Sequence, residues 1–125
     1  MIVGLGIDLV ETERVERILA RHGERFERRV FTGAELAECG RRADRIHSLA
    51  ARFAAKEACL KALGTGWSQG LGFADVEVVC TSDGAPTLRL AGRAAERARE
   101  LGVEVTHVSL THQPRTAAAV VVLEG

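Results

Sequence analysis

The chain has 125 residues, with seventeen basic and seventeen acidic side chains, so its formal net charge is zero. This balance argues against a nucleic-acid-binding protein that works through overall positive charge. The length and the 46% hydrophobic content are those of an ordinary globular domain, and we expect residues 1–125 to form one domain.

The N-terminus and the cysteines bear on where the protein works. The segment Met1–Gly4 has no basic leader before its apolar residues, and Asp8 interrupts the run, so we expect no signal peptide. No apolar stretch of the sequence approaches the ~20 residues that span a bilayer. The three cysteines are far apart and form no Cys-x-x-Cys pair, which favours a reducing cytoplasm over a disulfide framework or a zinc site.

The first thirty residues predict a strand and a helix. Residues 2–10 are almost wholly apolar and predict a buried strand. Residues 12–29 predict one amphipathic helix, which Gly23 weakens in its middle. The apolar face of this helix comprises Val15, Ile18, Leu19, His22 and Phe26.

Two further helices are predicted in the middle of the chain. Thr32 and Glu35 form a capping-box pattern, which starts a short helix that ends near Gly40. Residues 45–63 are the strongest helix candidate, because alanines fill the segment. Its capping and terminating residues are Asp44 and Gly64.

The C-terminal half predicts strands and one helix after a glycine-rich loop at 64–72. Residues 92–101 predict the helix, which Gly102 closes. The predicted strands are 76–80, 87–90, 104–111 and 116–123. This order of elements predicts a single α+β domain, with a mainly antiparallel sheet packed against a long central helix.

Both lysines of the chain lie in one short segment of the predicted helix 45–63. Glu57 and Lys61 are spaced i, i+4 and share a face, so a surface salt bridge between them is one explanation. Arg52 and Lys56 form a second pair on another face. Lys56 could serve a nucleotide or merely the helix surface.

Asp8 interrupts an otherwise apolar strand, where an aspartate is unusual. It could cap the helix that follows, although Thr12 could do so too, or it could hold a cation. Asp8 and Glu57 together would form an oxygen-ligand pair suited to Mg²⁺, with Lys61 beside it to offset phosphate charge. Spacing alone leaves these explanations open, because it does not show that the two acids meet.

Short blocks of sequence carry a more specific signal, in one order along nearly the whole chain. They are Gly-Leu-Gly-Ile-Asp-Leu-Val at 4–10, Arg-Phe-Ala-Ala-Lys-Glu-Ala at 52–58, Lys-Ala-Leu-Gly-Thr-Gly at 61–66, Asp-Val-Glu-Val at 75–78, Gly-Ala-Pro at 84–86 and His-Val-Ser-Leu-Thr-His at 107–112. This combination resembles holo-acyl-carrier-protein synthase, the small bacterial type of 4′-phosphopantetheinyl transferase. The resemblance implies the fold of that family.

The resemblance also implies an activity. Such an enzyme moves the phosphopantetheine arm of coenzyme A to a serine of apo acyl carrier protein, and releases adenosine 3′,5′-bisphosphate, in fatty acid biosynthesis. Carried over by motif, Asp8 and Glu57 would bind Mg²⁺ and Lys61 would contact the pyrophosphate, so these three form the expected catalytic set. Glu57 or a Mg²⁺-bound water would deprotonate the carrier serine.

The same resemblance implies contacts with coenzyme A. The expected coenzyme A-binding residues are Lys61, Arg52, Gly64, Thr65, Gly66 and His112. His112 could instead be a strand-end histidine that faces water. Ala85 departs from the family pattern, where a lysine is common, and this weakens the expected affinity for coenzyme A.

A stripe of arginines on the predicted helix 12–29 is a candidate partner surface. Its members are Arg14, Arg17, Arg21 and Arg25. They could be an ordinary solvated helix face, or they could dock an acidic protein. The resemblance favours docking of acyl carrier protein, and it also implies a homotrimer whose active sites lie between subunits.

Two other functions compete with the transferase. One is a non-catalytic α+β interaction module that binds an acidic protein through the arginine stripe. The other is a Mg²⁺-dependent nucleotide hydrolase, against which the lack of a Walker motif argues.

Overall fold

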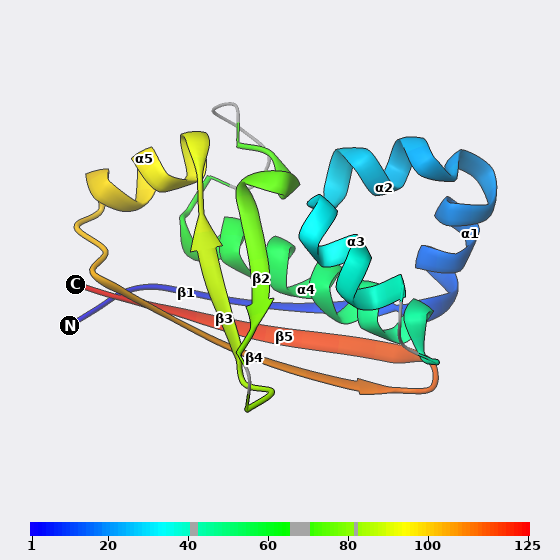
Figure 1. Ribbon diagram of the computed structural model, residues 1–125. Coiled ribbons are helices and arrows are strands. Elements are labelled where there is room, and N and C mark those ends of the chain that lie inside the picture. The colour runs from blue at the N-terminus through cyan, green and yellow to red at the C-terminus, as the bar shows by residue number, and fades with distance from the viewer. Residues whose placement is uncertain (41–42, 66–70, 82) are drawn as a thin grey trace.

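The computed structural model describes residues 1–40, 43–65, 71–81 and 83–125. Its three long strands form an antiparallel sheet in the order β1-β5-β4. These strands are β1 (Ile2–Glu11), β4 (Val105–Gln113) and β5 (Thr116–Glu124). Both chain ends lie at one end of this sheet, where the Met1 ammonium donates a 2.9 Å hydrogen bond to the Gly125 carbonyl oxygen (Figure 1).

The central helix α4 (Arg45–Ala62) packs on the inner face of this sheet. Its many buried alanines leave room for β1 to approach the helix backbone closely. The glycines of β1 are needed for this approach, because a Cβ atom at Gly6 would overlap the Ala58 carbonyl oxygen. The predicted α+β class, with an antiparallel sheet against a long central helix, is therefore confirmed.

The remaining elements surround α4 (Figure 1). The helices α1 (Thr12–His22), α2 (Glu24–Val30) and α3 (Gly33–Gly40) gather at one end of the molecule. A short turn of 3₁₀ helix, η1 (Phe73–Asp75), leads into the hairpin of β2 (Val76–Cys80) and β3 (Pro86–Leu90), which crosses α4. The helix α5 (Gly92–Glu100) lies at the opposite end.

The prediction of one continuous helix over 12–29 is wrong, because the chain turns at Gly23. Gly23 has a φ of +51°, a value that favours glycine, and its N–H donates to the Leu19 carbonyl oxygen at 2.8 Å. Two consequences follow. Arg25 lies on α2 rather than on α1 with the other stripe arginines, and His22 is exposed instead of packing on the apolar face.

The predicted caps have different outcomes. The capping box before α3 is confirmed, since the Thr32 N–H donates to Glu35 Oε1 at 2.9 Å and the Glu35 N–H to Thr32 Oγ1 at 3.2 Å. Asp44 does occupy the N-cap position of α4, but its side chain makes no capping hydrogen bond. The carboxylate lies instead 3.8 Å from His112 Nε2.

The outer face of the sheet is apolar along β1 and β5, and it is most exposed along β1. Leu5, Ile7 and Leu9 of β1 are between 64% and 70% exposed, and Val122 and Val120 of β5 lie beside Leu5 and Ile7. The helices lie on the other side of the sheet (Figure 1). Within the part of the chain that is described, no helix is long and apolar enough to cross a membrane.

Candidate active site

The first cluster joins the end of β1 to the last turns of α4. Lys61 Nζ lies 2.9 Å from Asp8 Oδ1 and donates to the Ile7 carbonyl oxygen at 3.0 Å. The lysine side chain is 55% exposed, whereas the aspartate is 8% exposed. The expected i, i+4 pair of Glu57 and Lys61 is therefore replaced by a contact across the fold, although the charge of Lys61 still acts on Glu57.

Glu57 lies beside Asp8 and has an unusual pKa of about 7. Burial contributes most to this raised pKa, and the hydrogen bond and negative charge of Asp8 contribute next. The positive charges of Arg14 and Lys61 act in the opposite direction. The two acids thus meet in space, as a magnesium pair requires.

The second oxygen of Asp8, Oδ2, is buried, and no donor among the described residues forms a hydrogen bond with it. A proton held on Glu57 could serve this oxygen, and so could a cation. Mg²⁺ is typically held by one or two carboxylates, with water and substrate phosphates as its remaining ligands. The residues present therefore fit Mg²⁺, and no group of three or more His, Cys, Asp and Glu in the described ranges offers a larger metal site.

Arg14 also reaches this cluster, from the first turn of α1. Its guanidinium carbon lies 5.8 Å from the centre of the Phe53 ring, and its charge lowers the pKa of Glu57. Arg17, one turn later, pairs with Glu13 at 3.7 Å, and both side chains are largely exposed. The first arginine of the stripe, Arg14, therefore lies near Glu57, a contact that the sequence pattern did not indicate.

A second cluster combines Arg52 of α4 with His112 of β4. Both line one cavity of about 200 Å³, together with Asp44, Ser48 and Cys80. Arg52 was expected to contact coenzyme A, and yet it is only 3% exposed. His112 is 42% exposed, so it is partly open to water.

The structure does not bring all the expected coenzyme A residues into one cavity. Asp8, Glu57 and Lys61 are absent from the lining of the cavity that holds Arg52 and His112. Arg52 lies near the middle of α4, whereas Glu57 and Lys61 lie nearer its C-terminal end, so the two clusters are separate within this chain.

The expected glycine loop begins where α4 ends. Gly64 has a φ of +78° and Thr65 is buried, while Gly66 lies outside the described residues. Arg97 of α5 donates to the Leu63 carbonyl oxygen at 3.1 Å, next to Gly64. Sequence reasoning missed this arginine, whose only signal was its place in the last turn of a helix.

Lys56 corrects a further expectation, because it serves neither a nucleotide nor the helix surface. Its side chain is fully buried, and Nζ lies 2.6 Å from Glu35 Oε1. It also donates to the carbonyl oxygens of Phe73 and Val76. Burial lowers the pKa of Lys56, and the charge of Glu35 opposes this effect. Lys56 therefore ties α4 to α3 and to the start of β2.

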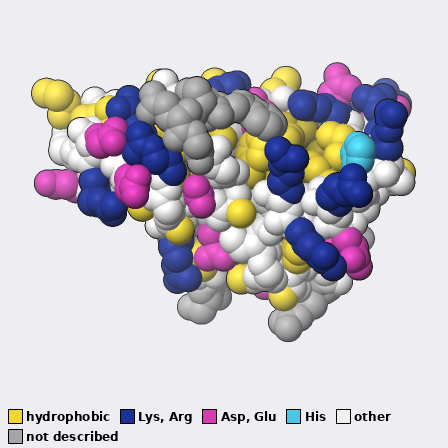
Figure 2. Space-filling view, turned by 90° about the horizontal axis from the view of Figure 1, so that it is seen from above, with side chains coloured by type: hydrophobic (Ala, Val, Ile, Leu, Met, Phe, Trp, Pro, Cys, Tyr) yellow, Lys and Arg dark blue, Asp and Glu magenta, His cyan; other side chains and the backbone are white. Residues whose placement is uncertain are grey.

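Basic side chains gather over the end of the molecule formed by α1 and α2, around an apolar area (Figure 2). A hollow of about 310 Å³ lies there, lined by His22, Arg25, Phe26 and Arg29. The turn at Gly23 brings this second group of cations onto α2. The basic surface is consequently broader than the single stripe that the sequence predicted.

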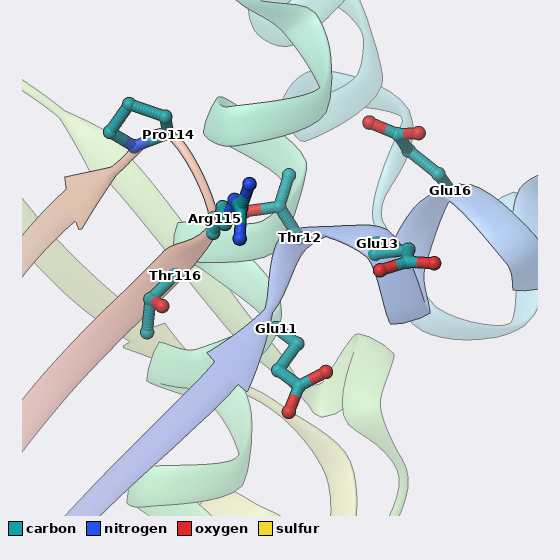
Figure 3. Close-up of a pocket in the computed structure, with 7 residues that line it drawn as sticks. All are labelled: Glu11, Thr12, Glu13, Glu16, Pro114, Arg115 and Thr116. Carbon is teal, nitrogen blue, oxygen red and sulfur yellow. The ribbon is translucent and has the colours of Figure 1, made fainter.

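A larger cavity of about 640 Å³ lies between the start of α1 and the turn that joins β4 to β5 (Figure 3). Its lining includes Glu11, Glu13 and Glu16, with Arg115 and Thr12. None of the expected catalytic or coenzyme A-binding residues belongs to it. Its size alone therefore does not make it the active site.

Comparisons with known proteins are consistent along the whole chain. Residues 4–120 match the 4′-phosphopantetheinyl transferase superfamily. The chain is 56% identical to the holo-[acyl-carrier-protein] synthase of Methylobacterium radiotolerans, over 100% of this chain and 95% of that protein.

Solved structures agree. The holo-[acyl-carrier-protein] synthase of Neisseria meningitidis is similar with a TM-score of 0.92, at 32% identity and with both chains fully covered. The Helicobacter pylori holo-[acyl-carrier-protein] synthase in complex with coenzyme A is similar with a TM-score of 0.85, at 32% identity, over 96% of this chain and 99% of that one.

Proposed function

From the premise that this chain belongs to the holo-[acyl-carrier-protein] synthase family of the 4′-phosphopantetheinyl transferase superfamily, we propose a Mg²⁺-dependent transfer reaction. The phosphopantetheine arm moves from coenzyme A to a serine of apo acyl carrier protein, and adenosine 3′,5′-bisphosphate leaves. The observation that carries this proposal is the meeting of Asp8, Glu57 and Lys61. Membership of an enzyme family decides against a non-catalytic interaction module.

Asp8 and Glu57 are the proposed ligands of Mg²⁺, which when bound supplies positive charge to the pyrophosphate of coenzyme A. Asp8 Oδ2 is buried and has no donor among the described residues once Glu57 is ionised, which supports this role. Glu57 is also a candidate to accept the proton of the carrier serine, although a carboxylate that holds a metal is a weaker base than a free one. A water molecule at the site remains an equal candidate for that base.

Lys61 is the proposed contact of the pyrophosphate. An ammonium group has three N–H donors, and Asp8 and the Ile7 carbonyl oxygen occupy two of them. The third remains for a ligand oxygen at the exposed end of the side chain. As charge grows on the leaving group, this fixed cation stabilises it.

The proposed coenzyme A-binding set also contains Arg52, His112, Gly64, Thr65 and Gly66. The cavity that Arg52 and His112 share supports a nucleotide site, because it places two cationic or potentially cationic groups at one opening. Its volume of about 200 Å³ is below the ~300–1,000 Å³ of typical ligand sites. We therefore assign it to one end of the coenzyme, not to the whole molecule.

The acyl carrier protein is proposed to dock on the basic surface of α1 and α2. The proposed contacts are Arg14, Arg17, Arg21 and Arg25. Since Arg14 also lies beside Glu57, a carrier bound there would have its serine close to the carboxylates. Such a surface attracts an acidic partner and makes association depend on salt.

A homotrimer with active sites between subunits remains part of the proposal. Two observations support it: the exposed apolar face formed by Leu5, Ile7 and Leu9, and the separation of the two site clusters within one chain. We further propose that residues 1–125 form one domain that works in fatty acid biosynthesis in the cytoplasm. Cys39, Cys59 and Cys80 form no disulfide with one another, which suits that compartment.

One assay tests this function. The protein is incubated with coenzyme A, Mg²⁺ and apo acyl carrier protein, and the carrier is then weighed by mass spectrometry. We expect a gain of one phosphopantetheine arm, which a metal chelator and the Glu57→Gln substitution should both abolish. An unchanged carrier mass with the parent protein would contradict the proposal, and parent-rate transfer by Glu57→Gln would remove Glu57 from the site.

A further inference from the structure

Arg52 is a buried cation, 3% exposed, and it forms no ion pair with an acidic side chain in the described part of the chain. Asp44 and Glu77 each line a cavity together with Arg52 without pairing with it. The partners of Arg52 are neutral: Nη1 donates to Ser48 Oγ at 2.6 Å, and Nη2 to Cys80 Sγ at 3.5 Å. Nε is buried and has no acceptor among the described residues. A buried charge is costly unless an opposite charge joins it, so this cation is suited to an anionic ligand.

Ser48 fixes where this cation lies. It precedes Arg52 by one turn of α4 and is itself buried, so the guanidinium folds back along the helix instead of extending into water. Ser48 Oγ is held in turn by Cys39 Sγ at 3.2 Å. The hydroxyl therefore has partners on two sides, and its position is determined by the packing of α3 against α4.

His47, the residue before Ser48, restricts the position of His112, which lines the same cavity as Arg52. Its ring stacks on His112, with centroids 5.4 Å apart and planes at 29°. His47 Nε2 lies 3.0 Å from the Pro114 carbonyl oxygen, so this nitrogen carries the proton that is donated. The Pro114 contact anchors His47 to the turn after β4, and the stacked ring limits how His112 can rotate.

We propose that His47 and Ser48 are positioning residues for coenzyme A. Ser48 holds Arg52, and His47 holds His112, so that both groups face the cavity that takes the phosphate-bearing nucleotide end of the coenzyme. Neither residue touches the reacting atoms. The inference rests on the proposed function for the identity of the ligand, while the two pairs of contacts are independent of it.

The test uses the full chain with Ser48→Ala and His47→Ala. Because each loses one fixing contact, we expect the KM and Kd for coenzyme A to rise about 3- to 10-fold, with kcat within about twofold of the parent. Thr106→Val, which also loses a hydroxyl, here replaced by a methyl group at the far end of β4, should change neither. The variant His47→Phe keeps a stacking ring and should recover most of the affinity. A drop in kcat at unchanged KM would overturn the proposal.

A double-substitution comparison separates positioning from a merely structural role. In an Arg52→Gln background, Ser48→Ala should have no further effect on the Kd for coenzyme A, because its only proposed action is through Arg52. The same factor in both backgrounds would overturn the proposal for Ser48. His47→Ala tests the second positioning residue. The side chain of His47 is only partly buried, so this variant should fold. An unchanged Kd for coenzyme A would overturn the proposal for His47.

Direct binding distinguishes this inference from the proposed function. Coenzyme A is titrated into each variant by calorimetry, without carrier protein. A parent protein that binds coenzyme A but transfers nothing would contradict the proposed function alone, and the binding constants would still decide the positioning roles. A parent protein that binds no coenzyme A would overturn both.

Discussion

Lys61 Nζ lies 2.9 Å from Asp8 Oδ1, although 53 positions separate the two residues along the chain. The contact exists because Gly6 lets β1 approach α4, so that the end of the strand meets the last turns of the helix. An exposed ammonium is thereby fixed against a buried carboxylate. This pair carries the first prediction.

Lys61→Ala should lower kcat/KM for coenzyme A by about 10²- to 10³-fold, the usual effect of removing one fixed donor from a charge-stabilising site. The fold should persist, because the side chain is more than half exposed. Steady-state kinetics with saturating carrier protein measure the effect. Arg99→Ala, an exposed cation on α5, is the matched control and should behave as the parent. Equal kinetics for both variants would remove Lys61 from the site.

The binding of Mg²⁺ should depend on pH around the pKa of Glu57, which is about 7. Below that pH Glu57 is protonated and must lose its proton before it can bind a metal, so the Kd for Mg²⁺ should rise about tenfold per pH unit. Above about pH 8 it should be constant. Calorimetric titrations between pH 5.5 and 8.5 measure this, and Glu57→Gln should show no such slope. The same affinity at pH 6 and pH 8 would contradict the role of Glu57.

In the metal-free protein, the raised pKa of Glu57 should make the free energy of unfolding depend on pH. The folded-state pKa of Glu57 lies above its ordinary value of 4.5, so the protonated form favours the fold. The free energy of unfolding should therefore decrease as the pH rises from about 4.5 to about 7, and this contribution should be lost above that pH. Urea unfolding with a chelator present, compared between the parent and Glu57→Gln, measures this contribution, which the glutamine variant should lack.

Gly6→Ala should destabilise the protein by about 1–3 kcal/mol, as expected for an overpacked contact. The new Cβ atom would overlap the Ala58 carbonyl oxygen, which is backbone and cannot rotate away. Since β1 would then move from α4, the Kd for Mg²⁺ should rise as well. Thermal unfolding and Mg²⁺ titration measure the two effects. The control is Gly33→Ala, where nothing lies within 4 Å of the added atom and stability should not fall.

Lys56→Met should destabilise the protein by about 3–5 kcal/mol, because it leaves the buried carboxylate of Glu35 without its counter-charge. Chemical denaturation measures the loss. Arg28→Ala removes an exposed ion pair with Glu24 and should change stability by less than about 1 kcal/mol. Similar small losses for the two variants would show that the buried pair contributes little.

Arg21→Glu should weaken binding of acyl carrier protein while leaving the Kd for coenzyme A unchanged, because no residue of α1 lines the cavity of Arg52. The loss should shrink as salt is added, since exposed charges are screened. Surface plasmon resonance at two ionic strengths measures the carrier, and calorimetry measures the coenzyme. Equal losses for both ligands would count against a docking role for this surface.

The sequence predicted what short-range signals determine. The bounds of α4, the capping box of Thr32 and Glu35, and the β2–β3 hairpin follow from residues within a few positions of each other, and the structure confirms them. The break at Gly23 was signalled by the glycine but not predicted, because a glycine in a helix can be tolerated.

The contacts that the sequence missed are all made across the fold. Lys56 was expected to serve a nucleotide or merely the helix surface, whereas the packing of α3 against α4 supplies Glu35 as its buried partner. Likewise, the spacing of Asp8 and Glu57 could suggest a metal pair without showing that they meet. That step requires the register of β1 on α4, which no local pattern encodes.

One helix, α4, carries residues of both proposed ligand sites. Arg52 and Lys61 belong to the same uninterrupted helix, α4, and are nine residues apart, or about 14 Å along its axis. Any change that slides or tilts α4 against the sheet therefore displaces the cluster of Glu57 and Lys61 together with the cavity of Arg52. A substitution can therefore alter one of these places without the other only by changing a side chain. The close contacts of Gly4 and Gly6 with the backbone of α4 fix the distance between helix and sheet for both places.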